Sequence, residues 1–369
     1  MKMLGCGQAV PINNHYHNLK SICVKYHMAK QKTAVIIGIT SQDGSYLAEL
    51  LLEKGYKVVG TLRRSTSINH ENIEHLKKSL ILESADLTDQ ESLNRVMIKH
   101  QPDEVYNIAA QSVPADSWSH PFYTGEVTAL GPVRVFEAVR HFCPNARIYQ
   151  ATSREILGGV EGVESANEST PVFANNPYGI AKAYAHMMID CYRKSYGMFV
   201  CGGILFNHES PRRSLHFVTR KISMGVACIK LGIKNPPTNE IGEPLVDTEG
   251  KIHLGDLNAT RDWGYSKDYV EAMWLMLQQD TPKDYVIGTN TNYSIKDACK
   301  AAFDHVGLNW ENHVVSDSKL IRPTEITDMK GDYSLAKKEM GWEPKVFMKE
   351  LMEIMVDSDI EWIKRNHLT

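Results

Sequence analysis

The stretch from Ala34 to Ser65, AVIIGITSQDGSYLAELLLEKGYKVVGTLRRS, constrains the fold more than any other part of the chain. Thr33–Ile39 is apolar and β-branched, Ser45–Lys54 has the leucine spacing of a helix, and Lys57–Leu62 is apolar again. This order predicts a strand, a helix and a second strand parallel to the first. Such a unit is the usual start of a doubly wound α/β sheet.

Two glycines stand in the turn between the first predicted strand and the helix. Gly38 suits a tight turn, Gly44 suits close packing of the helix on the strand, and Ser41 occupies the position where a third glycine is usual. A turn of this kind lets the backbone approach a pyrophosphate, which the helix N-terminus then binds. Ser41 is small, and its hydroxyl can bond a phosphate or cap the helix. The pattern therefore predicts a nucleotide-cofactor loop rather than an ordinary turn.

The end of the second predicted strand indicates which cofactor this is. NAD-binding folds place a carboxylate there for the ribose 2′-hydroxyl, whereas this chain has Arg63 and Arg64, followed by Ser65 and Thr66. A guanidinium binds a 2′-phosphate through charge-assisted hydrogen bonds, and a carboxylate would repel it. We therefore predict NADP, with a solvated charged loop as the alternative.

The remaining chain continues the alternation of strands and helices. Further strands are predicted at 81–87, 104–110, 147–153, 200–206 and 285–288, and helices at 90–100, 122–142, 176–196, 266–279, 295–306 and 347–365. The helix at 122–142 should bend near Gly131-Pro132. Residues 208–265 are rich in proline, glycine and charge and predict a loop-rich segment. We expect a Rossmann-like doubly wound parallel sheet over 33–207, with segments near 260–290 returning to it, and a smaller α/β substrate lobe over 208–369.

Composition excludes several classes of function. The 369 residues carry a formal net charge of -3, which gives no reason to expect nucleic acid or a membrane surface as a partner. The 7 cysteines are scattered without metal-ligand spacing, so we expect no metal site, reduced thiols and a cytoplasmic location. Residues 1–32 contain lysines and no acidic side chain, and we expect them to form an extension outside the fold.

Candidate acid/base residues follow the fifth predicted strand. Tyr178 and Lys182 in NPYGIAKAY are four residues apart and therefore share one helix face. A phenol needs a nearby cation to act as a base at neutral pH, and the lysine can supply it. The hydroxyl partner is expected at Thr152 or Ser153 in QATSREILGG, unless both only cap a turn. Glu155 is a candidate second acid/base. The residues alone are equally consistent with a charge at the rim of the site or with a helix cap.

Together these motifs resemble the GDP-mannose 4,6-dehydratase family of the extended short-chain dehydrogenases/reductases, over nearly all of residues 33–360. The most specific segments are GITSQDGSYLAELLLEKGY, VYNIAAQS, NPYGIAKAYA, ILFNHESPRR, FVTRKI, RDWGYSKDYV and RPTEITDMKGD. The resemblance implies that Tyr178 takes the proton of the sugar 4-hydroxyl while NADP accepts the C4 hydride, with Lys182 supporting both. Glu155 would then move the C5 proton to the departing 6-hydroxyl, and Ser153 matches the family's catalytic threonine. The hydride would return to C6, giving GDP-4-keto-6-deoxymannose.

The resemblance also implies binding residues. Cofactor contacts would come from Gly38, Ile39, Thr40, Ser41, Gln42, Asp43, Gly44, Arg63, Arg64, Ser65, Thr66, Asp86, Leu87, Ile108, Ala109, Ala110, Gln111, Ser112, Tyr123, Lys182, His208 and Arg213. The nucleotide sugar would contact Asn207, Val218, Lys221, Arg261, Arg322 and Glu325. A homo-oligomer is implied as well: a dimer through the helices at 122–142 and 176–196, or a tetramer in which the Arg63–Glu74 loop reaches a neighbouring cofactor site.

The chain departs from the family pattern at several points. Ser41 replaces the middle glycine, NPYG stands for the family's SPYG, and STSELYG reads as TSREILG, which puts Ser153 for threonine and Arg154 for serine. The extra cation of Arg154 suggests a second activity, reduction of the 4-keto product with NADPH to GDP-rhamnose. A stand-alone GDP-4-keto-6-deoxymannose reductase, an NDP-sugar 4-epimerase and a non-catalytic NADP-binding scaffold are the alternatives. An epimerase has no need of Glu155.

Overall fold

The computed structural model describes residues 31–64, 70–160, 162–238, 242–320 and 328–367. Four predicted site residues, Ser65, Thr66, Arg322 and Glu325, lie outside the described residues. The expectation for residues 1–32 falls almost entirely outside them too. The boundary predicted between the two halves at 207 stays a prediction.

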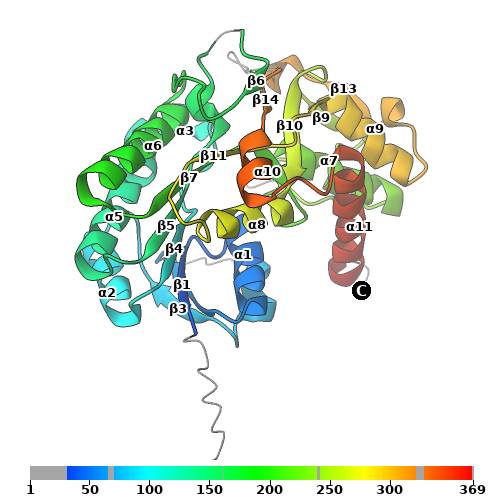
Figure 1. The fold of residues 1–369 in the computed structure, drawn as a ribbon. Helices are drawn as coiled ribbons and strands as arrows, with labels where there is room; N and C mark the ends of the chain where they lie inside the picture. Colours follow the sequence, from blue (N-terminus) through cyan, green and yellow to red (C-terminus); the bar gives the residue numbers. More distant parts are fainter. Residues whose placement is uncertain (1–30, 65–69, 161, 239–241, 321–327, 368–369) are drawn as a thin grey trace, which may run out of the picture. The chain divides into compact units, whose positions relative to one another are not determined.

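A sheet of seven parallel strands forms the centre of the described chain (Figure 1). Its order is β11-β7-β5-β4-β1-β2-β3, with every neighbouring pair parallel. The strands are β1 (Thr33–Ile37), β2 (Lys57–Leu62), β3 (Ile81–Ser84), β4 (Glu104–Asn107), β5 (Arg147–Ala151), β7 (Val200–Leu205) and β11 (Tyr285–Ile287). Strands covered on both faces can be apolar throughout, and β1 and β7 are buried along their whole length. The predicted doubly wound fold class is confirmed.

Helices cover both faces of this sheet (Figure 1). On one face lie α2 (Gln90–His100), α5 (Gly131–Phe142) and α6 (Pro177–Tyr196), and on the other α1 (Gln42–Glu53) and α8 (Ser266–Met276). The helix predicted over 122–142 is divided into α4 (Pro121–Thr124), a π-helical segment at Gly125–Leu130, and α5. We expected a bend near Gly131-Pro132, and the structure has the change from π-helix to α-helix there, where Pro132 has no N–H to donate to the preceding turn. A short helix, α3 (Asp116–Ser119), precedes α4.

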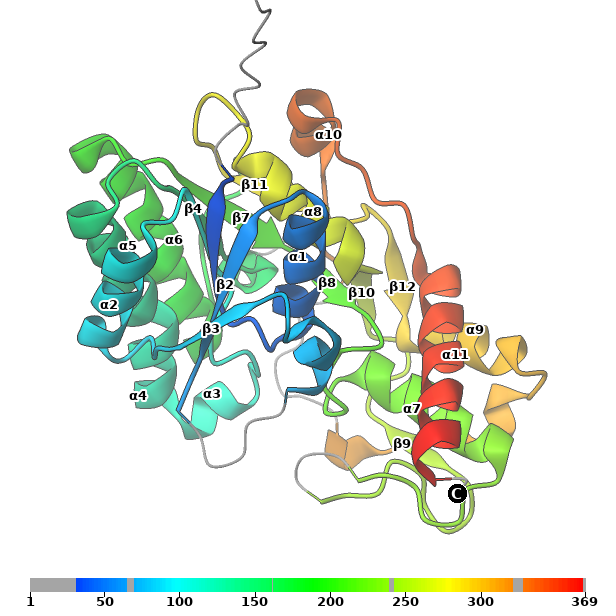
Figure 2. The same cartoon turned by 90° about the horizontal axis from the view of Figure 1, so that it is seen from below.

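The second half of the chain builds a lobe beside the sheet (Figure 2). It contains a three-stranded sheet of β8 (Asn207–Glu209), β10 (Thr260–Tyr265) and β12 (Asn292–Ser294), and the strand pair β9 (Ile252–Leu254) and β13 (Val314–Ser316). A second short pair, β6 (Ser165–Ala166) and β14 (Lys330–Gly331), joins two distant parts of the chain. Helices α7 (Val218–Leu231), α9 (Ile295–His305) and α11 (Met348–His367) share one apolar core. The remaining helix is α10 (Ser334–Met340), and short 3-10 helices lie at Glu71–Leu76 (η1), Arg154–Leu157 (η3), Trp310–Asn312 (η4) and Ser318–Leu320 (η5).

The loop-rich reading of 208–265 was wrong for its first part, which contains the 14-residue helix α7. This helix packs against α9, α11 and β9, and nine of its residues are buried. Its sequence therefore lacks the single polar face by which an amphipathic helix is recognised. Gly225 shows how close the packing is, because a Cβ there would lie 2.5 Å from Ile252 Cδ1. The burial that forms α7 is therefore invisible in the local pattern of the sequence.

No helix within the described ranges is both long enough and apolar enough to cross a membrane.

Candidate active site

The glycine turn between β1 and α1 is built by steric necessity. Gly38 has φ +99°, and a Cβ there would lie 3.0 Å from the Ala109 backbone nitrogen. A Cβ at Gly44 would lie 2.3 Å from the Gly38 carbonyl oxygen, so no side chain fits at that position. Ser41 caps α1: its hydroxyl accepts from the Gly44 N–H at 3.1 Å and donates to the Gly38 carbonyl at 2.7 Å. Of the two roles expected for Ser41, the structure provides the cap.

A cavity of about 1130 Å³ opens at the carboxyl ends of the strands. The sheet order reverses between β1 and β4, and such a switch point is where open α/β sheets bind ligands. Most of the predicted cofactor residues line this carboxyl-edge cavity: Gly38, Thr40, Ser41, Gln42, Asp43, Arg63, Asp86, Leu87, Ile108, Ala109, Ala110, Ser112, Tyr123 and Arg213.

Six predicted cofactor residues are not part of the cavity wall: Ile39, Gly44, Arg64, Gln111, Lys182 and His208. Ile39 is fully buried, and the backbone N–H of Gln111 donates to Thr128 Oγ1 at 3.1 Å. The two arginines after β2 differ, because only Arg63 reaches the cavity, where it donates to the Tyr123 hydroxyl at 2.6 Å.

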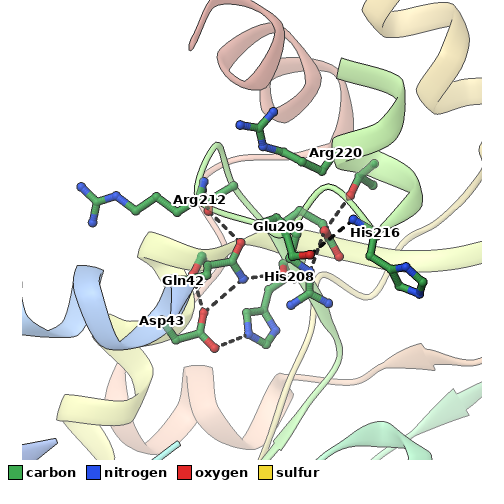
Figure 3. A network of polar contacts seen from close by, with 12 residues as sticks. Gln42, Asp43, His208, Glu209, Arg212, His216 and Arg220 are labelled. Atoms are coloured by element: carbon green, nitrogen blue, oxygen red, sulfur yellow. Dashed lines mark hydrogen bonds and ion pairs between the residues drawn. The ribbon is translucent and has the colours of Figure 1, made fainter. Parts of the chain in front are cut away.

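A polar network joins the first turn of α1 to β8 (Figure 3). Asp43 Oδ2 lies 2.8 Å from His208 Nε2, and Asp43 Oδ1 accepts from Ser266 Oγ at 2.5 Å. Gln42 donates to the His208 carbonyl at 3.1 Å and accepts from Ser210 Oγ at 2.7 Å. The cofactor loop is thereby tied to the strand that begins the predicted substrate residues, at Asn207.

Asp43 and His208 each stabilise the charged form of the other. Burial pushes the pKa of Asp43 up, but the charge of His208 and the hydrogen bonds from His208 and Ser266 outweigh it and lower that pKa to about 2. Burial pushes the pKa of His208 down, yet Asp43 and the Phe206 carbonyl raise it above its ordinary value of 6.5. The pair is therefore ionised over a wide range of pH.

The four predicted catalytic residues lie together at the end of β5 and the start of α6. Burial raises the pKa of Tyr178, the charge of Glu155 raises it further, and Ser153 lowers it through a hydrogen bond. Burial lowers the pKa of Lys182 to about 8, while Asp43 acts in the opposite direction. Lys182 Nζ donates to the Ala151 carbonyl at 2.8 Å and lies 5.9 Å from the centre of the Tyr178 ring.

The structure distinguishes between the two hydroxyls left open at the end of β5. Thr152 Oγ1 is buried and donates to the Gly203 carbonyl at 2.8 Å, a bond within the sheet. Ser153 caps η3 by accepting from the Glu155 N–H at 3.3 Å, and its hydroxyl is close enough to Tyr178 to lower the pKa of that phenol. Ser153 is therefore the hydroxyl that faces the candidate acid/base residues.

The described substrate residues lie on the lobe and outside the cavity wall. Asn207 begins β8, Val218 and Lys221 stand in the first turn of α7, and Arg261 is on β10. Burial lowers the pKa of Lys221. The first turn of α7 has no side-chain cap, so its N–H groups remain available for an anion.

Several cavity residues were not predicted. Arg212 and Arg220 line the wall, where Arg212 pairs with Glu49 and Arg220 pairs with the fully buried Asp359. Trp362 of α11 also lines it and donates to Glu71 Oε1 at 2.7 Å. The two arginines stand inside the motifs PRR and FVTRKI, which could have indicated them. Nothing local marks Trp362, because only the tertiary fold brings α11 to this wall.

Within the described part of the chain, no group of three or more His, Cys, Asp or Glu side chains is placed to hold a metal ion.

Comparison with known proteins shows the family of the chain. The family model described as GDP-mannose 4,6 dehydratase matches residues 35–355. The chain belongs to this family. It is 45% identical over 347 residues to GDP-mannose 4,6 dehydratase 1 of Arabidopsis thaliana, covering 91% of each chain. It is 41% identical over 363 residues to GDP-mannose 4,6 dehydratase of Homo sapiens, covering 91% of this chain and 93% of the relative.

Solved structures of more distant proteins share the fold. UDP-glucose 4-epimerase of Thermotoga maritima with UDP-glucose has a TM-score of 0.75 at 22% identity, covering 90% of this chain and 99% of that one. The structure of RMD from Pseudomonas aeruginosa with NADPH has a TM-score of 0.71 at 17% identity, with coverages of 90% and 100%. dTDP-glucose 4,6-dehydratase of Bacillus anthracis with NAD has a TM-score of 0.73 at 20% identity, with coverages of 91% and 98%.

The Asp43–His208 pair predicts a pH-dependent stability. The pKa of Asp43 falls on folding from 3.8 to about 2, so its contribution is present above pH 3.8 and lost as the pH falls towards 2. The pKa of His208 rises on folding, so its contribution is complete below pH 6.5 and lost as the pH rises through the folded value. A His208→Gln variant should lose about 2 kcal/mol of unfolding free energy between these limits and less at alkaline pH, measured by urea unfolding.

His253→Gln is the matched control, because His253 pairs with Asp247 at 2.7 Å on the surface and should contribute about 0.5 kcal/mol or less. The His208 ring also stacks on Tyr269, with the ring centres 4.6 Å apart. An equal loss for His208→Gln at every pH would show that this packing, and not charge, explains its effect.

Proposed function

We propose that the chain is a GDP-mannose 4,6-dehydratase, a hydro-lyase that converts GDP-D-mannose to GDP-4-keto-6-deoxy-D-mannose. The observation that carries this proposal is the juxtaposition of two acid/base groups: Glu155 follows β5, and Tyr178 stands at the start of α6, whose Gly179 packs against the Glu155 backbone. One proton transfer serves hydride transfer at C4, and a second is needed to remove water across C5 and C6. Family membership over residues 35–355 supports the same reading.

A nicotinamide cofactor would supply a hydride acceptor for C4 and a hydride donor for C6. The glycine turn with its close backbone approach, and the cavity at the switch point, fit such a dinucleotide. Tyr178 accepts the proton of the sugar 4-hydroxyl. Because burial and Glu155 raise the pKa of Tyr178, the phenolate that this requires would be stabilised by the Lys182 ammonium group near its ring together with the positive charge of an oxidised nicotinamide. Ser153 donates a hydrogen bond that orients the reacting oxygen.

Glu155 performs the dehydration. The carbonyl formed at C4 acidifies the hydrogen on C5, and Glu155 removes it as a proton. The same carboxyl group then protonates the 6-hydroxyl, so that the C6–O bond breaks, a C5–C6 double bond forms and water leaves. The elements of water balance, because one proton comes from C5 and the hydroxyl from C6. When the hydride returns to C6, the proton that Tyr178 took from the 4-hydroxyl would be available for C5.

The diphosphate of the nucleotide sugar is assigned to the first turn of α7 and to β10. Lys221 is a partly buried cation beside the open N–H groups of that turn, and Arg261 supplies a second charge. Both features favour a dianionic group, because the helix N-terminus carries a partial positive charge. Arg322 and Glu325 are proposed for the same ligand from the resemblance of RPTEITDMKGD.

NADP is the proposed form of the cofactor, and Arg63 is the group that selects it. Arg63→Gln should raise the Kd for NADP about 10- to 100-fold, because a charge-assisted bond to the 2′-phosphate is lost, and should leave the Kd for NAD nearly unchanged. Titration calorimetry measures both constants. Arg64→Gln is the control, since Arg64 does not line the cavity. Equal losses for NADP and NAD in Arg63→Gln would contradict this assignment.

A homodimer is proposed through α3, α4 and α6. Large apolar side chains are exposed there: Trp118 60%, Phe122 90%, Ile180 57%, Tyr184 42% and Met187 62%. An exposed apolar surface of this kind, on helices that pack together, is typical of a subunit interface. The tetramer stays a prediction, since the loop that would build it lies partly outside the described residues. A cytoplasmic location also stays a prediction.

Phe122→Glu combined with Met187→Glu should reduce the mass in solution to that of one chain, measured by light scattering. Buried glutamates at an interface lack partners, and this destabilises the dimer. Ile98→Glu, at an exposed apolar residue of α2, should leave the mass unchanged. A double variant with the wild-type mass would place the interface elsewhere.

The decisive test of function is incubation of the purified protein with GDP-mannose, followed by NMR of the product. The wild-type chain should form the 4-keto sugar without added NADPH, because the hydride returns to the product. Glu155→Gln should reduce this rate by about 100-fold or more while the Kd for NADP is kept. Glu164→Gln, an exposed carboxylate further along the chain, is the control.

Added NADPH separates the remaining functions. Further conversion to GDP-rhamnose would support the second activity suggested by Arg154, and a keto sugar that persists contradicts it. Product only in the presence of NADPH would favour a stand-alone reductase. Inversion at C4 would favour an epimerase, and cofactor binding without turnover a scaffold.

A further inference from the structure

Two residues that depart from the family pattern, Arg154 and Asn176, each contact one oxygen of the Glu155 carboxylate. Arg154 Nε lies 3.4 Å from Glu155 Oε1, and Asn176 Nδ2 donates to Glu155 Oε2 at 2.8 Å. The Arg154 side chain is 5% exposed, that of Glu155 18%, and Asn176 8%. We propose that Asn176 and Arg154 are positioning residues that hold Glu155 for dehydration, an inference that rests on the role proposed for Glu155.

Asn176 is the more informative of the two because its amide has two functions. Its Oδ1 accepts from the Gly179 N–H at 2.8 Å and so caps α6, the helix that carries Tyr178 and Lys182. Its Nδ2 is free to donate to Glu155 at the same time. An amide has a separate acceptor and donor, whereas the serine of SPYG has a single oxygen for both. One side chain thus connects the second acid/base to the helix of the first.

The backbones of η3 and α6 approach closely at the same place. A Cβ on Gly179 would lie 2.5 Å from the Glu155 carbonyl oxygen, so these two segments touch without a side chain between them. The start of α6 is fixed further by the Tyr178 N–H, which donates to Ser117 Oγ at 3.3 Å. Glu155 and Tyr178 are therefore parts of one rigid unit and not of two independent loops.

This arrangement determines which face of Glu155 can react. A carboxylate offers about four lone-pair sites, of which Asn176 and Arg154 use two, one on each oxygen. The remaining sites are left for the C5 proton and the 6-hydroxyl. Hydrogen bonds to a charged oxygen are stronger than those between neutral groups. Asn176 and Arg154 therefore hold the Glu155 carboxylate in one orientation for C5 proton removal and for protonation of the 6-hydroxyl.

Asn176→Asp tests the proposal, because aspartate caps a helix as well as asparagine but has no donor for Glu155. We expect kcat to fall about 10- to 100-fold. The KM for GDP-mannose and the Kd for NADP should stay at wild-type values, and the protein should remain folded, with a urea midpoint lowered by the two neighbouring carboxylates. The kinetic isotope effect with 5-deuterated GDP-mannose should rise, since C5 proton removal becomes slower relative to hydride transfer.

Asn176→Ser removes the objection that aspartate only repels Glu155. Serine restores the family residue and keeps a capping oxygen. We therefore expect kcat to fall less than in Asn176→Asp, and the isotope effect to change in the same direction. A wild-type kcat in both variants, or a fall in kcat that accompanies loss of cofactor affinity or folding, overturns the positioning role. Failure of the wild-type chain to form the keto sugar overturns the proposed function and with it this inference.

Discussion

The close approach of backbone to backbone at Gly38 and Gly44 is the constraint on which the rest of the site depends. Gly38 lies against Ala109 at the switch between β1 and β4, and Gly44 lies against the Gly38 carbonyl. A side chain at Gly44 would push α1 away from the turn after β1, and one at Gly38 would push that turn away from Ala109. The carboxyl ends of parallel strands lie at one edge of the sheet. The candidate residues that follow the strands of the first half therefore lie near this point.

Two buried carboxylates, Asp43 and Asp262, hold further segments of the structure in place. Asp43 joins the first turn of α1 to His208 on β8 and to Ser266 at the start of α8. Asp262 on β10 is fully buried and accepts from the N–H groups of Thr289, Asn290 and Gly331. Buried carboxylates need such donors, and each donor fixes a backbone segment in place. The predicted cofactor and substrate residues are thus held by shared polar contacts across the two halves.

The sequence predicted the central sheet well, because each buried strand is a short apolar run bounded by turn residues. It also identified Tyr178, Lys182 and Glu155 from spacing and motif context. It missed α7, whose burial on several sides removes the polar face that marks a helix. It treated Arg63 and Arg64 alike, and only side-chain placement shows that Arg63 reaches the cavity.

By itself, the sequence determined the fold class and the pairing of Tyr178 with Lys182 as candidate residues, since these follow from local periodicity and from residue types at fixed spacing. The family, and Glu155 as a candidate second acid/base, came from the resemblance of whole motifs. Only the tertiary structure decided that Ser153 rather than Thr152 faces Tyr178, that α11 reaches the cavity through Trp362, and that Arg154 and Asn176 meet on Glu155. These facts depend on contacts between segments far apart in the chain or on where a side chain points. Local sequence patterns carry neither kind of information.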